Sequence, residues 1–165
     1  MSRPVTLKGN PFTLAGEALK PGDQAPDFNV TGVDLKPVTL ADTSGVRIFS
    51  VVPSLDTPVC DAQTRRFNEA AAELGDVTVY TVSCDLPFAQ KRWCGAAGVD
   101  RVVTVSDYKD RSFGEAWGTM INELKIECRA LFVVDASGKI THVEYVPEIA
   151  EHPDYDAAIG AAKSA

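Results

Sequence analysis

The octapeptide PSLDTPVC, residues 53–60, places a cysteine where a strand is expected to hand over to a helix. If Thr57 caps the helix, Pro58 is its first residue and Cys60 its third, and both threonine and proline suit these positions. A sulfur there lies beside unpaired N–H groups at the positive end of the helix dipole, and both features favour a thiolate. The chemistry expected is therefore nucleophilic attack by sulfur. The alternative is that Cys60 is a small buried hydrophobic residue that starts a helix.

The other cysteines do not form a recognisable scaffold or metal motif. The four cysteines are Cys60, Cys84, Cys94 and Cys128. Four are too few for a disulfide framework in 165 residues, and none forms a C-x-x-C pair. His142 and His152 lack the spacing of a metal site. We therefore expect any important cysteine to be reactive rather than structural.

The elements that must position these residues alternate between strands and helices. The run from Val46 to Val52 is rich in β-branched residues and suits a strand buried on both faces. Helix formers follow from Pro58 to Leu74, with Gly75 as a stop signal. We further expect an N-terminal hairpin at 5–14 with a break at 9–11, strands at 28–31, 38–40, 77–82 and 102–105, helices at 87–97, 113–117 and 154–163, and a terminal hairpin of 130–134 with 140–146. This order predicts an α/β fold with a mixed central sheet flanked by helices.

Length and composition limit the possible functions. A chain of 165 residues with 45% hydrophobic content can bury one core, so we expect one domain spanning 1–165. The net charge of -7 argues against binding to nucleic acid or to an anionic membrane. No signal-peptide core and no membrane-length apolar run are present, so a cytoplasmic location is expected.

Three segments carry a family resemblance. The spacing Pro53-x-x-x-Thr57-x-x-Cys60 resembles the P-x-x-x-[TS]-x-x-C signature of peroxiredoxins, which have a thioredoxin-like fold. The segments DLPFAQKRWCG, residues 85–95, and GNPFTL, residues 9–14, are similar to the thiol peroxidase subfamily of atypical two-cysteine peroxiredoxins. Because the segments are dispersed in the expected order, the resemblance covers nearly the whole chain.

The resemblance implies a role for each matching residue. Cys60 would be the thiolate that attacks the terminal oxygen of a hydroperoxide, and the Thr57 hydroxyl would contact both sulfur and peroxide. Pro53 would shield the pocket from water. Arg129 matches the family's active-site arginine, whose fixed charge favours the thiolate and polarises the peroxide. From the residue alone, Arg129 reads instead as a solvated charge at a strand edge.

Cys94 matches the family's resolving cysteine, which would form a disulfide with the Cys60 sulfenic acid. A disulfide needs Cα atoms within about 7 Å, and two cysteines on separate helices rarely meet that condition. We therefore expect the first turn after Thr57 and the helix carrying Cys94 to unwind, with Gly95 and Gly98 making fraying easy. The alternative is an ordinary half-buried Cys94.

The two remaining cysteines have weaker claims. Cys84 is expected to be packed and inert. Cys128 is expected to be a bystander, but its neighbour Arg129 could lower its pKa and make it an alternative resolving or regulatory thiol. Glu127, which is unusual at this position, could offset the field of the arginine.

The resemblance implies reduction of hydrogen peroxide and alkyl hydroperoxides, re-reduction by thioredoxin, no cofactor and a homodimer. A redox sensor that passes its disulfide to a partner protein shares the first chemical step and stays open. A non-catalytic binding module with a thioredoxin-like fold is a third possibility.

Overall fold

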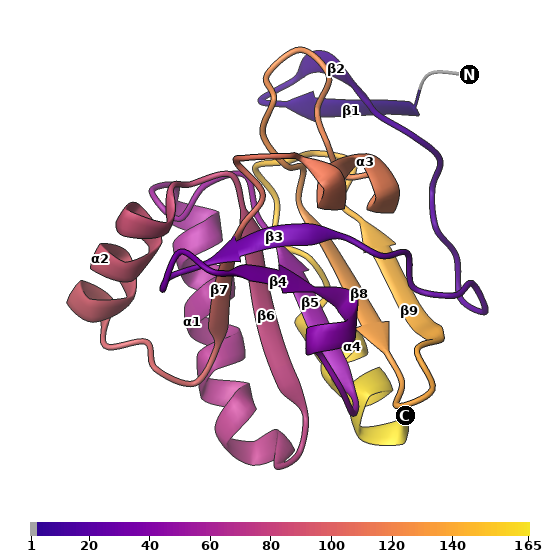
Figure 1. The fold of residues 1–165 in the computed structure, drawn as a ribbon. Helices are drawn as coiled ribbons and strands as arrows, with labels where there is room; N and C mark the ends of the chain where they lie inside the picture. The colour runs from indigo at the N-terminus through magenta and orange to yellow at the C-terminus, as the bar shows by residue number, and fades with distance from the viewer. Residues whose placement is uncertain (1–2) are drawn as a thin grey trace.

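The computed structural model describes residues 3–165 and contains two sheets and four α-helices (Figure 1). The strands are β1 (Arg3–Leu7), β2 (Asn10–Leu14), β3 (Asn29–Gly32), β4 (Pro37–Thr39), β5 (Arg47–Val51), β6 (Thr78–Ser83), β7 (Val103–Ser106), β8 (Ala130–Val134) and β9 (Ile140–Tyr145). The α-helices are α1 (Pro58–Leu74), α2 (Pro87–Ala97), α3 (Ser112–Trp117) and α4 (Tyr155–Ser164), and a 3-10 turn, η1, spans Leu40–Asp42. Every predicted element is present, with boundaries that match or differ by at most two residues.

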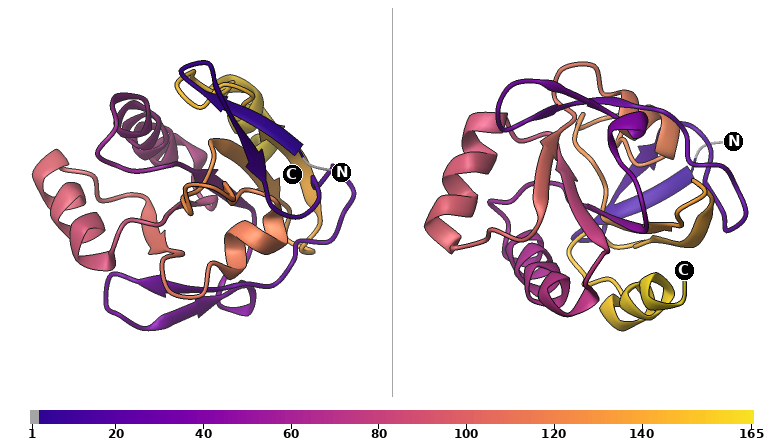
Figure 2. Two further views of the ribbon diagram at one scale, coloured as in Figure 1. Left: turned by 90° about the horizontal axis from the view of Figure 1, so that it is seen from above. Right: turned by 60° about the horizontal axis from the view of Figure 1, so that its bottom comes forward.

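Seven strands form a mixed central sheet in the order β4-β3-β7-β6-β5-β8-β9. Strands β5, β6 and β7 run parallel, whereas the β3–β4, β3–β7, β5–β8 and β8–β9 pairs are antiparallel. In the three views of Figures 1 and 2, α1 and α4 lie on one face of this sheet, and α3 lies on the other. The expected α/β fold with a mixed, helix-flanked sheet is confirmed.

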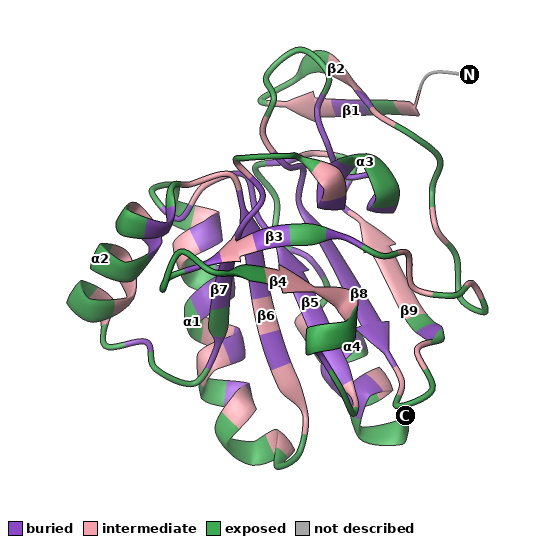
Figure 3. Ribbon diagram, viewed as in Figure 1, coloured by how far each residue is buried: buried purple, intermediate pink, exposed green. Residues whose placement is uncertain are grey.

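The buried central strands of the sheet direct successive side chains to its two opposite faces. All five residues of β5 and all five of β8 are buried, which appears as continuous purple in Figure 3. Ile48 packs in the core under α1 and α4, and Phe49 packs in the core under α3. Because successive side chains point to opposite faces, one strand serves both cores. The continuous apolar run is therefore explained by burial on both sides.

The N-terminal hairpin forms a separate two-stranded sheet above the end of the central sheet (Figure 1). Its turn is Lys8-Gly9, with φ of 51° and 81°, so the chain reverses one residue earlier than the predicted break at 9–11. Two positive φ values match the twist of the strands that they connect. The Thr6 N–H donates to Pro147 O at 2.9 Å, and the Ile149 N–H donates to Thr6 O at 2.8 Å. These bonds hold the hairpin against the segment that follows β9.

Within residues 3–165 no helix combines the length and the apolar character that crossing a lipid bilayer would require.

Candidate active site

The loop that joins β5 to α1 carries the predicted nucleophile. Thr57 occupies the N-cap position with φ −101° and ψ 148°, Pro58 begins α1, and Cys60 is its third residue. Cys60 is 0% exposed. The Thr57 hydroxyl donates to Ser54 O at 3.0 Å and makes no cap bond to the helix. The expected contact of this hydroxyl with the sulfur is not among the hydrogen bonds of the described residues.

Arg129 lies directly before β8 and points its guanidinium at the sulfur. Its Nη2 donates to Cys60 Sγ at 3.2 Å, its Nη1 to Gln63 Oε1 at 2.9 Å, and its Nε to Ile149 O at 2.8 Å. The side chain is 2% exposed, so it is not the solvated strand-edge charge of the alternative interpretation. Neither ion pair found among residues 3–165 includes Arg129. A buried cation without a carboxylate partner strongly favours an anion beside it, and the adjacent sulfur can become that anion.

Gln63 and Ser50 fix the orientation of this guanidinium and were not predicted from the sequence. Gln63 follows Cys60 by three positions, so both side chains lie on one face of α1. The Gln63 Nε2 donates to Ser50 Oγ in β5 at 2.7 Å. That bond leaves Oε1 facing Arg129. The spacing to Cys60 was the available signal, but a single buried glutamine has no distinctive sequence pattern.

An apolar hollow of about 210 Å³ adjoins the arginine. It brings together three of the predicted residues, Pro53, Thr57 and Arg129. Its walls are completed by the hairpin tip, by the start of α1 and by the loops before β8 and after β9. The lining consists of Leu7, Lys8, Pro53, Ser54, Thr57, Pro58, Val59, Ile126, Arg129, Ile149 and Ala150. Cys60 adjoins this hollow through its bond with Arg129, whereas Cys94 is not part of the lining.

Asp85 ties the loop before α1 to the start of α2. Its carboxylate accepts hydrogen bonds from Ser54 Oγ at 2.7 Å, from the Leu55 N–H at 2.8 Å and from Ser83 Oγ at 2.8 Å. Pro87, two residues later, begins α2. The loop carrying Pro53 and the helix carrying Cys94 therefore share one anchor.

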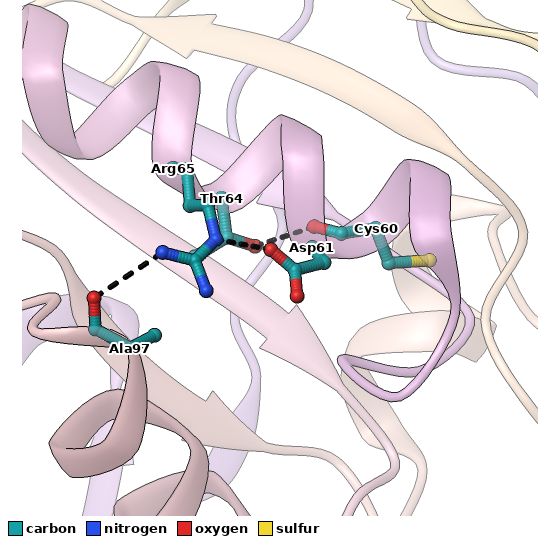
Figure 4. A network of polar contacts seen from close by, with 5 residues as sticks. All are labelled: Cys60, Asp61, Thr64, Arg65 and Ala97. Atoms are coloured by element: carbon teal, nitrogen blue, oxygen red, sulfur yellow. Dashed lines mark hydrogen bonds and ion pairs between the residues drawn. The ribbon is translucent and has the colours of Figure 1, made fainter.

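Arg65 forms a second connection between α1 and α2 (Figure 4). Its guanidinium donates to Ala97 O at 3.2 Å and pairs with Asp61 on its own helix. It also lies 5.6 Å from the ring centroid of Trp93. In Figure 4 the Cys60 sulfur points away from this contact, while the Cys60 carbonyl accepts a bond from Thr64 Oγ1 at 2.9 Å.

Cys94 lies on α2 as a half-buried thiol, and all four cysteines are free. Burial raises the pKa of Cys94, partly offset by a hydrogen bond with Thr104. Of the eleven residues of α2, only Pro87 and Gln90 are buried. The helix ends at Gly98, whose φ of 69° is left-handed and whose N–H donates to Cys94 O. Loose packing makes α2 a low-stability segment.

Cys84 and Cys128 lack the environment of a reactive thiol. Burial raises the pKa of both, and the nearby Glu127 carboxylate raises each further. Arg129 acts to lower the pKa of Cys128, as expected, but burial and Glu127 outweigh it, so the pKa of this thiol is raised. The prediction that Cys84 is unreactive agrees with its raised pKa.

Glu127 belongs to a buried polar cluster that sequence reasoning did not predict. Ligand atoms of Cys84, Asp107 and Glu127 lie within 4.8 Å of one another. The pKa of Glu127 is raised well above its usual range, mainly by burial and secondly by the neighbouring Asp107. Thr119 Oγ1 donates to Glu127 Oε2 at 2.5 Å, and the Gly114 N–H donates to Asp107 Oδ2 at 2.8 Å. The raised pKa favours the protonated form of Glu127 in this cluster.

Comparisons with known proteins show which family the chain resembles over its length. Residues 20–159 match the family model described as Redoxin. The chain is 58% identical over 161 residues to a thiol peroxidase of Bacillus subtilis (strain 168), covering 97% of this chain and 96% of that protein. A peroxiredoxin-like protein from Aquifex aeolicus has 43% identity and a TM-score of 0.92, covering 99% of this chain and 98% of that one. A thiol peroxidase from Chromobacterium violaceum, at 18% identity, shares the fold with a TM-score of 0.87, over 95% and 94% of the two chains.

Proposed function

The chain belongs to the Redoxin family as a thiol peroxidase of the peroxiredoxin type, an enzyme that reduces peroxides with thiols, and on that premise we propose that Cys60 is its peroxidatic cysteine and Cys94 its resolving cysteine. The observation that carries the proposal is the buried Arg129 guanidinium, 3.2 Å from Cys60 Sγ and without a carboxylate partner among residues 3–165. A thiolate at Cys60 neutralises that charge. The same donors can stabilise the oxygen anion that leaves the peroxide.

The first step is displacement at oxygen. The Cys60 thiolate attacks the terminal oxygen of the hydroperoxide, the O–O bond breaks, and the sulfur becomes a sulfenic acid. The released alkoxide takes up a proton and leaves as an alcohol, or as water when the substrate is hydrogen peroxide. Thr57 and Pro53 line the hollow beside Arg129, where they orient the peroxide and exclude water.

The second step joins the two cysteines. The Cys94 thiolate attacks the Cys60 sulfenic sulfur, a disulfide forms, and the hydroxide that leaves takes up a proton as water. Cys60 is fully enclosed, and Cys94 is half-buried on a different helix. Local unwinding of α2 and of the first turn of α1 supplies the required approach. The few buried residues of α2 keep the free energy of this unwinding small.

We assign hydroperoxides with an apolar body to the hollow beside Arg129, in addition to hydrogen peroxide. Its walls include Leu7, Val59, Ile126 and Ile149, which offer apolar contact to an alkyl group. A thioredoxin-type dithiol protein returns the electrons. The cycle needs no cofactor because sulfur carries both electrons.

Mass spectrometry after one equivalent of peroxide tests the assignment. We expect a Cys60–Cys94 disulfide in the native sequence and a persistent sulfenic acid at Cys60 in Cys94→Ser. Cys60→Ser should abolish peroxide consumption, whereas the matched control Cys128→Ser should leave it intact. A Cys60–Cys128 disulfide would overturn the resolving role. Peroxide consumption that stops after one equivalent, despite thioredoxin, thioredoxin reductase and NADPH, would indicate a sensor.

A further inference from the structure

Lys8 lines the hollow beside Arg129, and the reaction described above gives it no role. It forms the tip of the β1–β2 hairpin together with Gly9. The lining of the hollow contains two cationic residues, Lys8 and Arg129, and no aspartate or glutamate. The whole chain, in contrast, has 23 acidic and 16 basic residues. The hollow is therefore a local positive site on an acidic protein, and such a site favours a negatively charged ligand.

The charge of Lys8 is not used within the protein. Neither ion pair found among residues 3–165 includes Lys8. Glu148, which follows β9, contacts the hairpin, but its two carboxylate oxygens accept hydrogen bonds from the Thr6 hydroxyl at 2.9 Å and from the Gly9 N–H at 3.2 Å. Glu148 is not part of the lining of the hollow. The Lys8 ammonium is thus available to an anion that enters there.

The hairpin turn does not explain why this residue is a lysine. Lys8 and Gly9 both have a positive φ, and two-residue turns of this kind prefer Asn-Gly or Asp-Gly. A lysine in the left-handed region is uncommon. The bonds of Thr6 with Pro147 and Ile149 nevertheless hold the tip of the hairpin over the hollow. A role for the charged end of the side chain would account for lysine at this position.

The two cations of the hollow differ in depth. Arg129 is 2% exposed, whereas Lys8 is exposed to solvent and has a flexible four-carbon stem. The rest of the lining is mainly apolar and includes Leu7, Ile126 and Ile149. A molecule that matches all three features has a peroxide group at the buried cation, an alkyl chain against the apolar wall and an anionic group at the outer cation.

We propose that Lys8 is a specificity-determining residue that selects hydroperoxides of aliphatic carboxylic acids. The hydroperoxide group lies beside Arg129, the alkyl chain follows the apolar wall, and the Lys8 ammonium binds the carboxylate at the far end of the chain. This inference rests on the proposed function, because it takes Cys60 as the sulfur that meets the peroxide. It adds a second charged contact to the apolar one already assigned to the hollow.

A series of ω-hydroperoxy alkanoates and their methyl esters tests this selection. The acid and the ester share the chain and the peroxide but differ in charge. We expect the native enzyme to have a kcat/KM about two- to fivefold higher for the acid, the range of a partly exposed ion pair. The preference should appear only when the chain is long enough to reach from Arg129 to Lys8. It should diminish in added salt, because salt screens exposed charges.

Substitutions at the hairpin tip identify the source of the preference. Lys8→Gln keeps much of the side-chain length but not the charge, and it should lower the acid-to-ester ratio of kcat/KM to about one. Lys8→Arg should retain the native ratio, and Lys8→Glu should invert it. The matched control is Lys20→Gln, which removes an exposed lysine outside the hollow and should also retain the native ratio.

Three results would overturn the role of Lys8. They are an acid-to-ester ratio that Lys8→Gln leaves unchanged, a native preference for the ester at every chain length, and an equal loss of both activities in Lys8→Gln. Failure of the proposed function shows itself differently. In that case the native enzyme does not turn over even tert-butyl hydroperoxide, a neutral substrate without a long chain, or Cys60→Ser consumes it as fast as the native enzyme does.

Discussion

Replacement of Arg129 by methionine isolates the contribution of its charge to the reactivity of Cys60. Methionine has a similar length and an apolar, flexible side chain, so it can fill much of the buried space without donating hydrogen bonds. The variant loses the Nη2 contact with Sγ and leaves Gln63 Oε1 and Ile149 O without their arginine partner.

The expected magnitude follows from the bond to sulfur. A hydrogen bond to a charged group contributes about 1.5–3 kcal/mol, which corresponds to a change of about 10- to 150-fold. We therefore expect the rate constant for peroxide reduction near pH 7 to fall by that factor. The rate of Cys60 alkylation near pH 7 should fall as well, because the sulfur loses its adjacent cation.

Stopped-flow fluorescence can follow the oxidation, since Trp93 packs against the cluster that contains Cys60. Arg129→Lys is the matched control: it keeps the charge but loses the planar fork that reaches three acceptors. Its rate should lie between those of the native enzyme and Arg129→Met. Equal rates of peroxide reduction and of alkylation for the native enzyme and Arg129→Met would refute the claim that this guanidinium activates the sulfur.

Three other substitutions probe the surroundings. Gln63→Leu removes the acceptor that orients Arg129, and we expect a fall of about 5- to 20-fold in peroxide reduction; a Gln63→Leu enzyme with native stopped-flow kinetics would show that the orientation is set elsewhere. Burial raises the pKa of Glu127 in the folded protein above the ordinary value of 4.5 that applies to the unfolded chain. The protonated Glu127 therefore contributes to the free energy of unfolding in full below pH 4.5, and this contribution is lost as the pH rises through the pKa of the folded protein. Glu127→Gln cannot ionise and should flatten that decline in urea unfolding from pH 5 to 9, and a slope equal to the native one would contradict the assignment. Gly98→Ala forces a side chain into φ 69° at the end of α2, at a cost of about 1 kcal/mol, and hydrogen exchange across residues 87–97 should accelerate; unchanged protection there would argue against easy fraying.

The sequence was most informative where local rules and burial agree. The β-branched run at β5 and the Asp135–Gly138 turn between β8 and β9 indicated their structures correctly, because periodicity and turn chemistry act over a few residues. The position of Cys60 as third residue of α1 followed from the Thr57-Pro58 start signal. The hairpin turn at Lys8-Gly9 was displaced by one residue, because Lys8 itself adopts a left-handed φ.

The contacts between side chains that complete the site could not be predicted from the sequence. Gln63 and Ile149 meet Arg129, and Ser50 holds Gln63, only because β5, α1 and the segment after β9 converge there. Each residue is ordinary in its own segment. Arg129 shows the limit most clearly, since its residue type alone favoured a solvated charge and only the fold reveals that it is buried.

Cys60 and Cys94 lie in contrasting environments. This contrast suits the two steps of the proposed cycle, attack on peroxide and formation of the disulfide. Cys60 lies in a fully enclosed core beside a cation held by three hydrogen bonds, whereas Cys94 lies on a helix with two buried residues. In the proposed cycle, the rigid site keeps the Cys60 sulfur charged and aligned with the peroxide. The loosely packed helix would then let Cys94 reach Cys60 at a free-energy cost smaller than that of unfolding the core. If α2 were packed as tightly as β5, the sulfenic acid would form as fast but would wait longer for resolution, and further oxidation would compete.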